Sequence, residues 1–347
     1  MTEAMYICKN VQELKAYTPG EQPKDPGIIK LNTNENPYPP SPKVAEALRS
    51  FDYERLRLYP DPVFTELRRR IAEIHGCAVQ QIFIGNGSDE ILALCTRAFV
   101  EKSGSVGYFD PSYSLYPVLA DIRGVETRPV ALNADFTWRM PEGYGASLFF
   151  MTNPNAPTSM MYDKQVVTAF CRSFGGVVLI DEAYGDFADA NCMDLALASG
   201  NANTLVMRTF SKSFSLAGQR FGYVIGPDEL IGALYKIKDS YNMDMLAQVV
   251  GLAALNDLPY MRENVRKIRA TRARLTAALR RRGWTVCDSQ TNFLFARPPD
   301  GDAMGVFEAL KAAKIFVRYF PGPVTGEYLR MTIGTEEQAD ALLKQLV

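Results

Sequence analysis

Histidine is nearly absent from this sequence, since His75 is the only one among 347 residues. Sites built from several histidines, such as a zinc centre or an H-E-x-x-H metalloprotease, are therefore excluded. Serine or cysteine catalysis would need His75 itself as its base. His75 instead precedes Gly76 at the end of a helical pattern, where a cation is favoured. We therefore expect any proton shuttle to be a lysine, a tyrosine or a carboxylate.

The sequence also lacks paired cysteines, long apolar runs and net charge. Its six cysteines form no C-x-x-C pair, which favours buried thiols in a reducing compartment over zinc or disulfides. No stretch approaches the ~18 apolar residues of a membrane span, and the N-terminus shows no signal-peptide pattern. A net charge of −1 gives no reason to expect nucleic acid or a membrane as partner. We expect a cytoplasmic protein.

Short apolar runs alternate with amphipathic helical patterns through the middle of the chain. The runs typical of buried strands are "QIFIG", "SVGYFD", "SLFFMTN", "GVVLIDEAY" and "NTLVMRTF". This alternation predicts an α/β fold, with a large, doubly wound, mostly parallel sheet covered by helices on both faces. Beyond position 245 a long arginine-rich helical pattern, "PYMRENVRKIRATRARLTAALRRRG", precedes the short strands of a small α/β domain.

These patterns divide the chain into three predicted parts. We expect an N-terminal arm over residues 1–40 that packs with the small domain, a large domain over 41–245 and a small domain over 246–347. Two helices of the large domain are predicted to begin with a capping residue followed by proline, at Ser41–Pro42 and Asp61–Pro62. Gly76 is expected to end the second helix.

Chemically distinctive residues follow three of the apolar runs. Asp181 ends "GVVLID", Lys212 lies in "RTFSKSFSLAGQRFGY", and the glycine turn "GNGSD" at 85–89 precedes a helix. In open α/β sheets, ligands bind beyond the carboxyl ends of the strands, so these groups are expected near one site. The glycine turn suits an anion, although an ordinary strand-to-helix turn is an equal alternative. It is not the dinucleotide motif, because Glu90 replaces its third glycine.

The residues around Lys212 meet the needs of one cofactor. A lysine becomes nucleophilic when burial or a nearby positive charge keeps its amine neutral. The neighbouring hydroxyls and Arg220 can hold a phosphate, and Asp181 can pair with a protonated ring nitrogen. A lysine Schiff base, a phosphate cradle and an aspartate opposite a ring nitrogen are the requirements of pyridoxal phosphate. The sequence therefore predicts pyridoxal 5′-phosphate as cofactor and no metal.

The sequence resembles one family along nearly its whole length. The motifs that carry the resemblance are "AYTPG", "LNTNENP", "RLYPDP", "GNGSDEI", "DPSYSLYP", "NPNAPTS", "IDEAY", "RTFSKSFSLAGQRFGY" and "YLRMTIGT". The lysine segment and "DEAY" are the most specific of these motifs. On them the chain is similar to the fold-type I pyridoxal-phosphate aminotransferases, in particular to the histidinol-phosphate aminotransferase group.

The resemblance implies roles for individual residues. Lys212 would bind the aldehyde of the cofactor and move protons, Asp181 would pair with the ring nitrogen, and Tyr184 would contact the ring hydroxyl. The other residues implied for the cofactor are Tyr113 on the ring face, Gly87, Ser88, Asp89, Asn155, Thr209, Ser211 and Arg220, and Tyr59 from the other subunit of a homodimer with shared active sites. Those implied for the substrate are Arg318 and Arg330, which would hold its anionic group, with Tyr17 and Asn34.

One position departs from the pattern of the family. The family usually has an asparagine directly before the proline of "NPNAPTS", where it contacts the ring hydroxyl, and here that residue is Ala156. Asn155 lies one residue earlier, and Ser159 replaces the usual glycine. Either Asn155 reaches the ring, or Tyr184 contacts the ring hydroxyl alone.

The implied reaction is amino-group transfer between histidinol phosphate and 2-oxoglutarate, as in histidine biosynthesis. Two other enzymes would use the same site, namely an aromatic amino-acid aminotransferase and a lyase of the threonine-phosphate decarboxylase type. A protein that binds the cofactor without turnover is the alternative from another class. The presence of both Lys212 and Asp181 argues against it.

Overall fold

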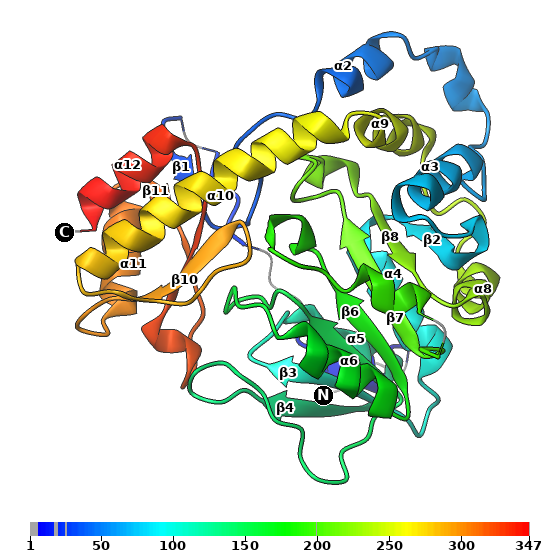
Figure 1. Ribbon diagram of the computed structural model, residues 1–347, viewed down its shortest axis with the longest axis horizontal. Helices are drawn as coiled ribbons and strands as arrows, with labels where there is room; N and C mark the ends of the chain where they lie inside the picture. Colours follow the sequence, from blue (N-terminus) through cyan, green and yellow to red (C-terminus); the bar gives the residue numbers. More distant parts are fainter. Residues whose placement is uncertain (1–5, 17–19, 25, 199, 347) are drawn as a thin grey trace.

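The computed structural model describes residues 6–16, 20–24, 26–198 and 200–346 (Figure 1). Its largest sheet has seven strands in the order β2-β8-β7-β6-β5-β3-β4. Their bounds are β2 Ile82–Gly85, β3 Ser105–Asp110, β4 Glu126–Ala131, β5 Leu148–Thr152, β6 Val177–Asp181, β7 Thr204–Thr209 and β8 Gly222–Ile225. Only β8 runs antiparallel to its neighbours in this sheet, β2 and β7. The predicted mostly parallel α/β sheet is confirmed.

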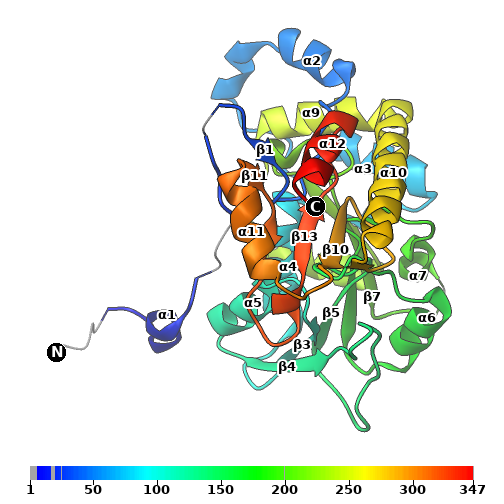
Figure 2. The same ribbon diagram turned by 90° about the vertical axis from the view of Figure 1, so that its left-hand side faces the viewer.

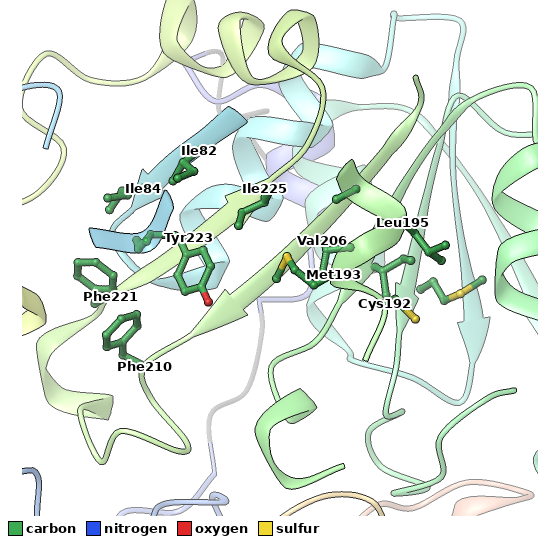
Figure 3. Close-up of a cluster of buried hydrophobic side chains, with 14 of the residues drawn as sticks. Ile82, Ile84, Cys192, Met193, Leu195, Val206, Phe210, Phe221, Tyr223 and Ile225 are labelled. Atoms are coloured by element: carbon green, nitrogen blue, oxygen red, sulfur yellow. The ribbon is translucent and has the colours of Figure 1, made fainter. Parts of the chain in front are cut away.

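Helices cover both faces of this sheet, as the unbroken apolar runs of its strands require. They are α3 Thr65–His75, α4 Gly87–Phe99, α5 Leu115–Arg123, α6 Lys164–Ser173, α7 Met193–Leu197, α8 Asp228–Ile237 and α9 Met245–Leu255. Helix α2 (Pro42–Arg49) instead packs on α9. Successive residues of one strand enter different cores: Val206 belongs to one buried cluster, and its neighbours Leu205 and Met207 belong to another. Figure 3 shows part of the first cluster, in which Phe210 and Phe221 lie beside Tyr223.

The C-terminal part of the chain is built around a four-stranded antiparallel sheet in the order β12-β13-β10-β9. Its strands are β9 Thr285–Val286, β10 Phe293–Arg297, β12 Arg318–Tyr319 and β13 Leu329–Thr332. Three helices accompany it: α10 Leu258–Arg281, α11 Ala303–Ala312 and α12 Glu336–Gln345. The long helix α10 runs from α9 along this sheet (Figure 1), and it buries an apolar stripe made of Val265, Ile268, Leu275 and Leu279.

The N-terminal segment joins the C-terminal part of the chain by strand pairing. Strand β1 (Ile29–Lys30) pairs in parallel with β11 (Ile315–Phe316). The short helix α1 (Lys9–Glu13) stands at the side of the molecule in Figure 2, where Asn10 donates to the backbone oxygens of Asp121 and Ile122 on α5. Between β1 and α2, Asn34 donates to the Tyr184 hydroxyl and Asn36 donates to the backbone oxygen of Lys212, so this segment runs close to the loops that follow β6 and β7.

Two of the helix predictions have different outcomes. Helix α2 begins at Pro42 with Ser41 as its cap, as predicted, because the Ser41 hydroxyl accepts a hydrogen bond from the Lys43 amide. The prediction of a helix start at Asp61–Pro62 was wrong, since α3 begins at Thr65. The Asp61 carboxylate instead accepts from the amides at 63 and 65 and stabilises a turn.

His75 is the last residue of α3, and Gly76 follows it in the left-handed conformation expected of a helix end. Its Nε2 lies 2.8 Å from the Tyr223 hydroxyl. Burial, and then the charge of Arg208, lower the pKa of His75 to about 4, so its ring is neutral rather than a cation at the helix end. None of the helices in the described ranges is long and apolar enough to cross a bilayer.

Candidate active site

A pocket lies beyond the carboxyl ends of β5, β6 and β7, where segments of the large sheet, the N-terminal arm and the small sheet meet. The site residues predicted from the sequence that line it are Asn34, Ser88, Asp89, Tyr113, Asp181, Tyr184, Thr209, Ser211, Lys212, Arg220, Arg318 and Arg330. For the residues of the large sheet this gathering follows from topology, because parallel strands deliver the residues after their ends to one edge of the sheet. Asn34 comes from the N-terminal arm, and Arg318 and Arg330 come from the small sheet.

Lys212 follows β7 by three residues, and its amine points into this pocket. Its Nζ donates to the backbone oxygen of Thr33 in the N-terminal arm at 3.2 Å. Burial, and then the charges of Arg330 and Arg220, lower the pKa of Lys212 to about 8, although the carboxylates of Glu35 and Asp89 act in the opposite direction. A buried amine near two guanidinium groups is partly neutral near neutral pH and is therefore a competent nucleophile.

Asp181 is the last residue of β6 and is only 3% exposed. Its Oδ2 accepts from the Tyr116 hydroxyl at 3.0 Å, and its Oδ1 accepts from the Ala183 amide at 3.0 Å. Burial raises the pKa of Asp181 to about 6 in spite of these two donors. A carboxylate at this position is therefore costly without a cationic partner in the pocket.

The hydroxyls and the guanidinium of the lysine motif form a polar corner of the pocket. Arg220 donates through Nη1 to Ser211 Oγ at 3.3 Å and through Nη2 to Asp89 Oδ2 at 3.2 Å. Thr209 Oγ1 donates to Ser211 Oγ at 3.1 Å. Ser88 belongs to the first turn of the 13-residue helix α4, which starts beside Arg220. Hydroxyls, a guanidinium and a helix N-terminus together suit a phosphate group.

Two glycines allow this corner to form. A Cβ at Gly87 would lie 2.5 Å from Arg220 Nη2, and Gly87 has a φ of +79° that L side chains rarely adopt. A Cβ at Gly222 would lie 2.9 Å from the backbone of Gly87 and Ser88. The glycine turn is therefore more than a strand-to-helix connection, because larger residues at 87 or 222 would displace either Arg220 or the start of α4.

Tyr184 lies in the loop after β6 and joins the pocket to the small sheet. Its ring packs edge-on against Phe293 of β10, with ring centroids 5.0 Å apart. Its hydroxyl accepts a hydrogen bond of 2.9 Å from the carboxamide of Asn34. Both Tyr184 and Phe187 follow β6 of the large sheet but belong to the buried cluster of the small sheet. The position of the Tyr184 phenol therefore depends on both sheets.

Asn155 is fully buried and does not line the pocket, whereas Ala156 does. The Asn155 carboxamide donates to Pro111 O and Thr158 Oγ1, and its oxygen accepts from Ser112 Oγ. These three bonds hold Asn155 in the loop, so of the two alternatives the structure favours Tyr184 without Asn155. Tyr113 lines the pocket and donates its hydroxyl to Asp89 Oδ1 at 3.2 Å.

Arg318 and Arg330 lie directly opposite each other in the antiparallel pair of β12 and β13. Directly opposed residues share one face of a sheet, so both guanidinium groups stand on the pocket side, and like charges in this arrangement are unfavourable. Arg330 donates to the backbone oxygen of Asn32 at 2.9 Å and lies over the ring of Phe320, as does Arg318. An anion between the two arginines would relieve the repulsion.

Four charged and hydroxyl residues beside the pocket were not predicted. Arg208 of β7 bonds Glu182 at 2.7 Å and Asp186 at 2.6 Å, and Asp186 accepts from the Ser213 hydroxyl. Glu182 follows Asp181, and Ser213 follows Lys212, so this network ties the two strand ends together. Glu182, Arg208 and Ser213 stand in the quoted motifs and Asp186 lies two residues beyond "DEAY", but only the fold brings these side chains into contact.

The remaining predicted residues lie outside the pocket or outside the described chain. Tyr59 is 78% exposed and stacks on Tyr241, with ring centroids 4.4 Å apart. Tyr17 lies outside the described residues. Within the described ranges, no group of three or more histidine, cysteine, aspartate or glutamate side chains could hold a metal ion.

Comparison with known proteins decides the family. The model of the aminotransferase class I and II family matches residues 26–346. The chain belongs to this aminotransferase family. It is 44% identical to the histidinol-phosphate aminotransferase of Geobacter sp. (strain M21) over 98% of this chain and 97% of that protein. It is 42% identical to the histidinol-phosphate aminotransferase of Microcystis aeruginosa over 97% and 96% of the two chains.

A solved structure shares the fold of this aminotransferase. The histidinol-phosphate aminotransferase of Sinorhizobium meliloti, in complex with pyridoxal-5′-phosphate, superposes with a TM-score of 0.87. The match covers 99% of this chain and 97% of that one, at 24% sequence identity. The predicted fold-type I architecture is confirmed.

Proposed function

We propose that this aminotransferase moves an amino group between histidinol phosphate and 2-oxoglutarate, as in histidine biosynthesis, with pyridoxal 5′-phosphate as cofactor. Among the features of the structure, the facing pair of Arg318 and Arg330 carries the substrate assignment. The named activity of the relatives that span nearly the whole chain supports the same assignment.

The residues present fit the cofactor at each of its polar groups. Ser88, Thr209, Ser211, Arg220 and the start of α4 would hold its phosphate, and Gly87 leaves room for Arg220 there. The Asp89 carboxylate holds Arg220 and Tyr113 in place from the side.

The ring of the cofactor has its own partners in the pocket. Asp181, whose burial calls for a cationic partner, would face the ring nitrogen. Tyr184 would face the ring hydroxyl, and Tyr113 would stack on the ring. When bound, the cofactor supplies an aldehyde that captures amino groups and a protonated ring that withdraws electrons.

Lys212 is the residue that we propose to move the proton. Because its pKa is lowered to about 8, part of its amine is neutral near neutral pH and can accept a proton at Nζ. Once protonated, the same Nζ can return the proton to a neighbouring carbon. Asp181 stays ionised during this transfer because a positive ring beside it would lower its raised pKa.

The two facing arginines favour a substrate with a doubly charged anion. A phosphate offers three oxygens to two guanidinium groups, whereas an amino-acid carboxylate carries one charge and two oxygens. This geometry favours histidinol phosphate over the alternative of an aromatic amino acid.

Amino-group transfer itself separates the rival activities. Purified protein supplied with cofactor, histidinol phosphate and 2-oxoglutarate should form glutamate. A decarboxylase would instead release carbon dioxide from threonine phosphate, and a protein that only binds the cofactor would form neither product. Absence of glutamate from protein whose cofactor is bound would overturn the proposed reaction.

We also propose that the protein is a cytoplasmic homodimer in which Tyr59 serves the site of the other subunit. The support for a dimer is a band of exposed apolar side chains around Tyr59, on α2 and the following turn: Leu48, Tyr53, Leu56 and Leu58. A second copy of the chain would cover this band. The support for a reducing compartment is that all six cysteines, which lie in the described residues, are unpaired.

A further inference from the structure

Asn34 is a buried residue of the N-terminal arm with an unusual backbone conformation. It is 1% exposed, and its φ of +55° lies in the left-handed region. Asparagine and aspartate enter this region more readily than other residues with side chains. Four hydrogen bonds to neighbouring residues hold Asn34 in this left-handed conformation.

Three of these bonds attach Asn34 to the small sheet. Its backbone amide donates to Thr332 Oγ1 at 3.0 Å, and the same hydroxyl donates to Asn34 Oδ1 at 3.1 Å. The carboxamide of Asn292 donates to the backbone oxygen of Asn34 at 3.0 Å. Thr332 ends β13 and Asn292 precedes β10, so the arm is fixed at the point where these two neighbouring strands meet.

The fourth bond points the other way, toward the large sheet. Asn34 Nδ2 donates to the Tyr184 hydroxyl at 2.9 Å. An amide N–H only donates, so the phenol oxygen is the acceptor in this bond and its own proton is directed to a different acceptor. Ala156 lines the same pocket, belongs to the same buried cluster as Tyr184 and carries no polar side chain.

We propose that Asn34 is a positioning residue for Tyr184 rather than a ligand of the substrate. It fixes the phenol so that Tyr184 donates its proton to the ring hydroxyl of the cofactor, and it links that contact to the small sheet. This inference rests on the proposed function, because it assumes that pyridoxal phosphate occupies the pocket.

Asn34→Asp is the variant that isolates this contact. Aspartate has the same shape, tolerates the same backbone conformation and keeps an oxygen for Thr332. It replaces the N–H that faces Tyr184 with an acceptor oxygen. The Tyr184 hydroxyl would then donate its hydrogen bond to residue 34 instead of to the cofactor. The cofactor oxygen then loses a donor, and its deprotonated form loses stabilisation.

The first readout is the pH titration of the visible absorbance of the bound cofactor. Asn34→Asp should raise the midpoint by about one pH unit, the size expected for one hydrogen bond. Asn32→Asp is the matched control, since Asn32 also lines the pocket and its carboxamide donates to Glu21 O instead. If added negative charge alone moved the midpoint, Asn32→Asp would raise it as well.

A double-mutant cycle with Tyr184→Phe tests whether Asn34 acts through the phenol. In the Tyr184→Phe background, Asn34→Asp should leave the midpoint unchanged. For histidinol phosphate, Asn34→Asp should lower kcat about tenfold with KM within about twofold, as expected when binding is spared. A midpoint shift that persists without the phenol, or a rise in KM with no shift, would overturn the proposal.

The same cycle in cofactor-free protein separates this proposal from the proposed function. The effects of Asn34→Asp and Tyr184→Phe on urea unfolding should be non-additive, because the two side chains are in contact. Additive effects would contradict the contact even if the enzyme transfers amino groups. Failure of wild-type protein to bind pyridoxal phosphate would instead refute the proposed function, and the unfolding cycle would still decide the contact.

Discussion

At the residue scale, Lys212 and Asp181 are both held in protonation states that cost stability until a partner arrives. The pKa of the lysine is lowered from 10.5 to about 8, and that of the aspartate is raised from 3.8 to about 6. Each shift is caused mainly by burial, which disfavours the charged form of each group. Contacts elsewhere in the fold must therefore offset the free-energy cost of these two buried charges. Opposite shifts in neighbouring groups are typical of sites that perform acid–base chemistry.

The pKa of Lys212 predicts how fast cofactor-free protein takes up pyridoxal phosphate. Only the neutral amine attacks an aldehyde, and a group with a pKa of about 8 is roughly tenfold more neutral at pH 9 than at pH 7. The initial loading rate should therefore rise about tenfold between these pH values, with a midpoint near 8. A midpoint near 10.5, the value of an unshifted lysine, would contradict the buried environment.

The same shift makes a prediction about stability, with the sign set by proton binding. The unfolded chain holds the Lys212 proton up to about pH 10.5, whereas the folded chain releases it near pH 8. Between these values the unfolded state binds more protons, so the contribution of Lys212 to stability rises with pH. Lys212→Met should remove this rise, measured as the wild-type minus variant difference in urea unfolding between pH 7.5 and 9.5.

Asp181→Asn should separate stability from activity. The amide carries no charge, so cofactor-free protein should gain up to about 3 kcal/mol at pH 7.5, because folding raises the pKa of Asp181 from 3.8 to about 6. Activity should fall by a hundredfold or more, because an amide cannot hold a ring nitrogen protonated. Urea unfolding and steady-state kinetics measure the two effects. Near wild-type turnover would show that Asp181 has another role.

At the element scale, the loops after β6 and β7 are tied together by charge. Arg208 is buried between Glu182 and Asp186, and these residues flank the segments that carry Asp181 and Lys212. The strands supply the positions of these loops, but the ion network fixes their relative placement. A shift of either loop would therefore change the distance between the carboxylate and the amine that share the site.

Removal of Arg208 should destabilise the fold strongly, because the carboxylates of Glu182 and Asp186 would lose their partner. Arg208→Met should destabilise the protein by about 3–5 kcal/mol, as for a broken buried ion pair. Arg266→Met on α10 is the matched control, since the ion pair of Arg266 with Glu263 is exposed and should contribute little to stability. Equal losses in urea unfolding would show that the network is no more important than a surface pair.

Much of the element order and part of the site could be predicted from the sequence, for a physical reason. Buried parallel strands are unbroken apolar runs, and Lys212, Asp181 and Arg220 stand next to such runs in contiguous motifs. The start of α3 was missed because Asp61 followed by Pro62 is also a good turn. The Asn34–Tyr184 bond joins residues 150 positions apart, and no local pattern records such a contact.

At the scale of the whole molecule, the pocket needs both sheets and the arm. Lys212 and Asp181 come from the seven-stranded sheet, Arg318 and Arg330 from the four-stranded sheet, and Thr33 from the arm between them. The predicted domain boundaries at residues 40 and 245 stay a prediction. The placement of the two arginines could not be predicted from periodicity, because their register across β12 and β13 depends on the connection between those strands.

The proposed homodimer predicts complementation between two inactive variants. Tyr59→Ala and Lys212→Ala should each be nearly inactive, and mixed dimers should regain activity because one of their two sites keeps both residues. Tyr53→Ala, in the same exposed band, is the control for a general loss of the interface. Sedimentation should show a dimer for the wild-type protein. An active monomer would refute the shared site.

The central claim is that this aminotransferase prefers an amino donor that carries a phosphate. The most direct test compares kcat/KM for histidinol phosphate, histidinol, phenylalanine and tyrosine in one assay with 2-oxoglutarate. Two arginines should contribute charge-assisted hydrogen bonds of about 1.5–3 kcal/mol each, so loss of the phosphate should cost a hundredfold or more. Arg318→Ala should reduce kcat/KM for histidinol phosphate more than for tyrosine.

Arg297→Ala supplies the control for that comparison, because Arg297 pairs with Glu327 on the same small sheet and does not line the pocket. It should leave the order of donors unchanged. The expected result is that histidinol phosphate has the highest kcat/KM of the four donors with the wild-type enzyme. A higher kcat/KM for phenylalanine or tyrosine would contradict it and assign the chain to the aromatic amino-acid aminotransferases.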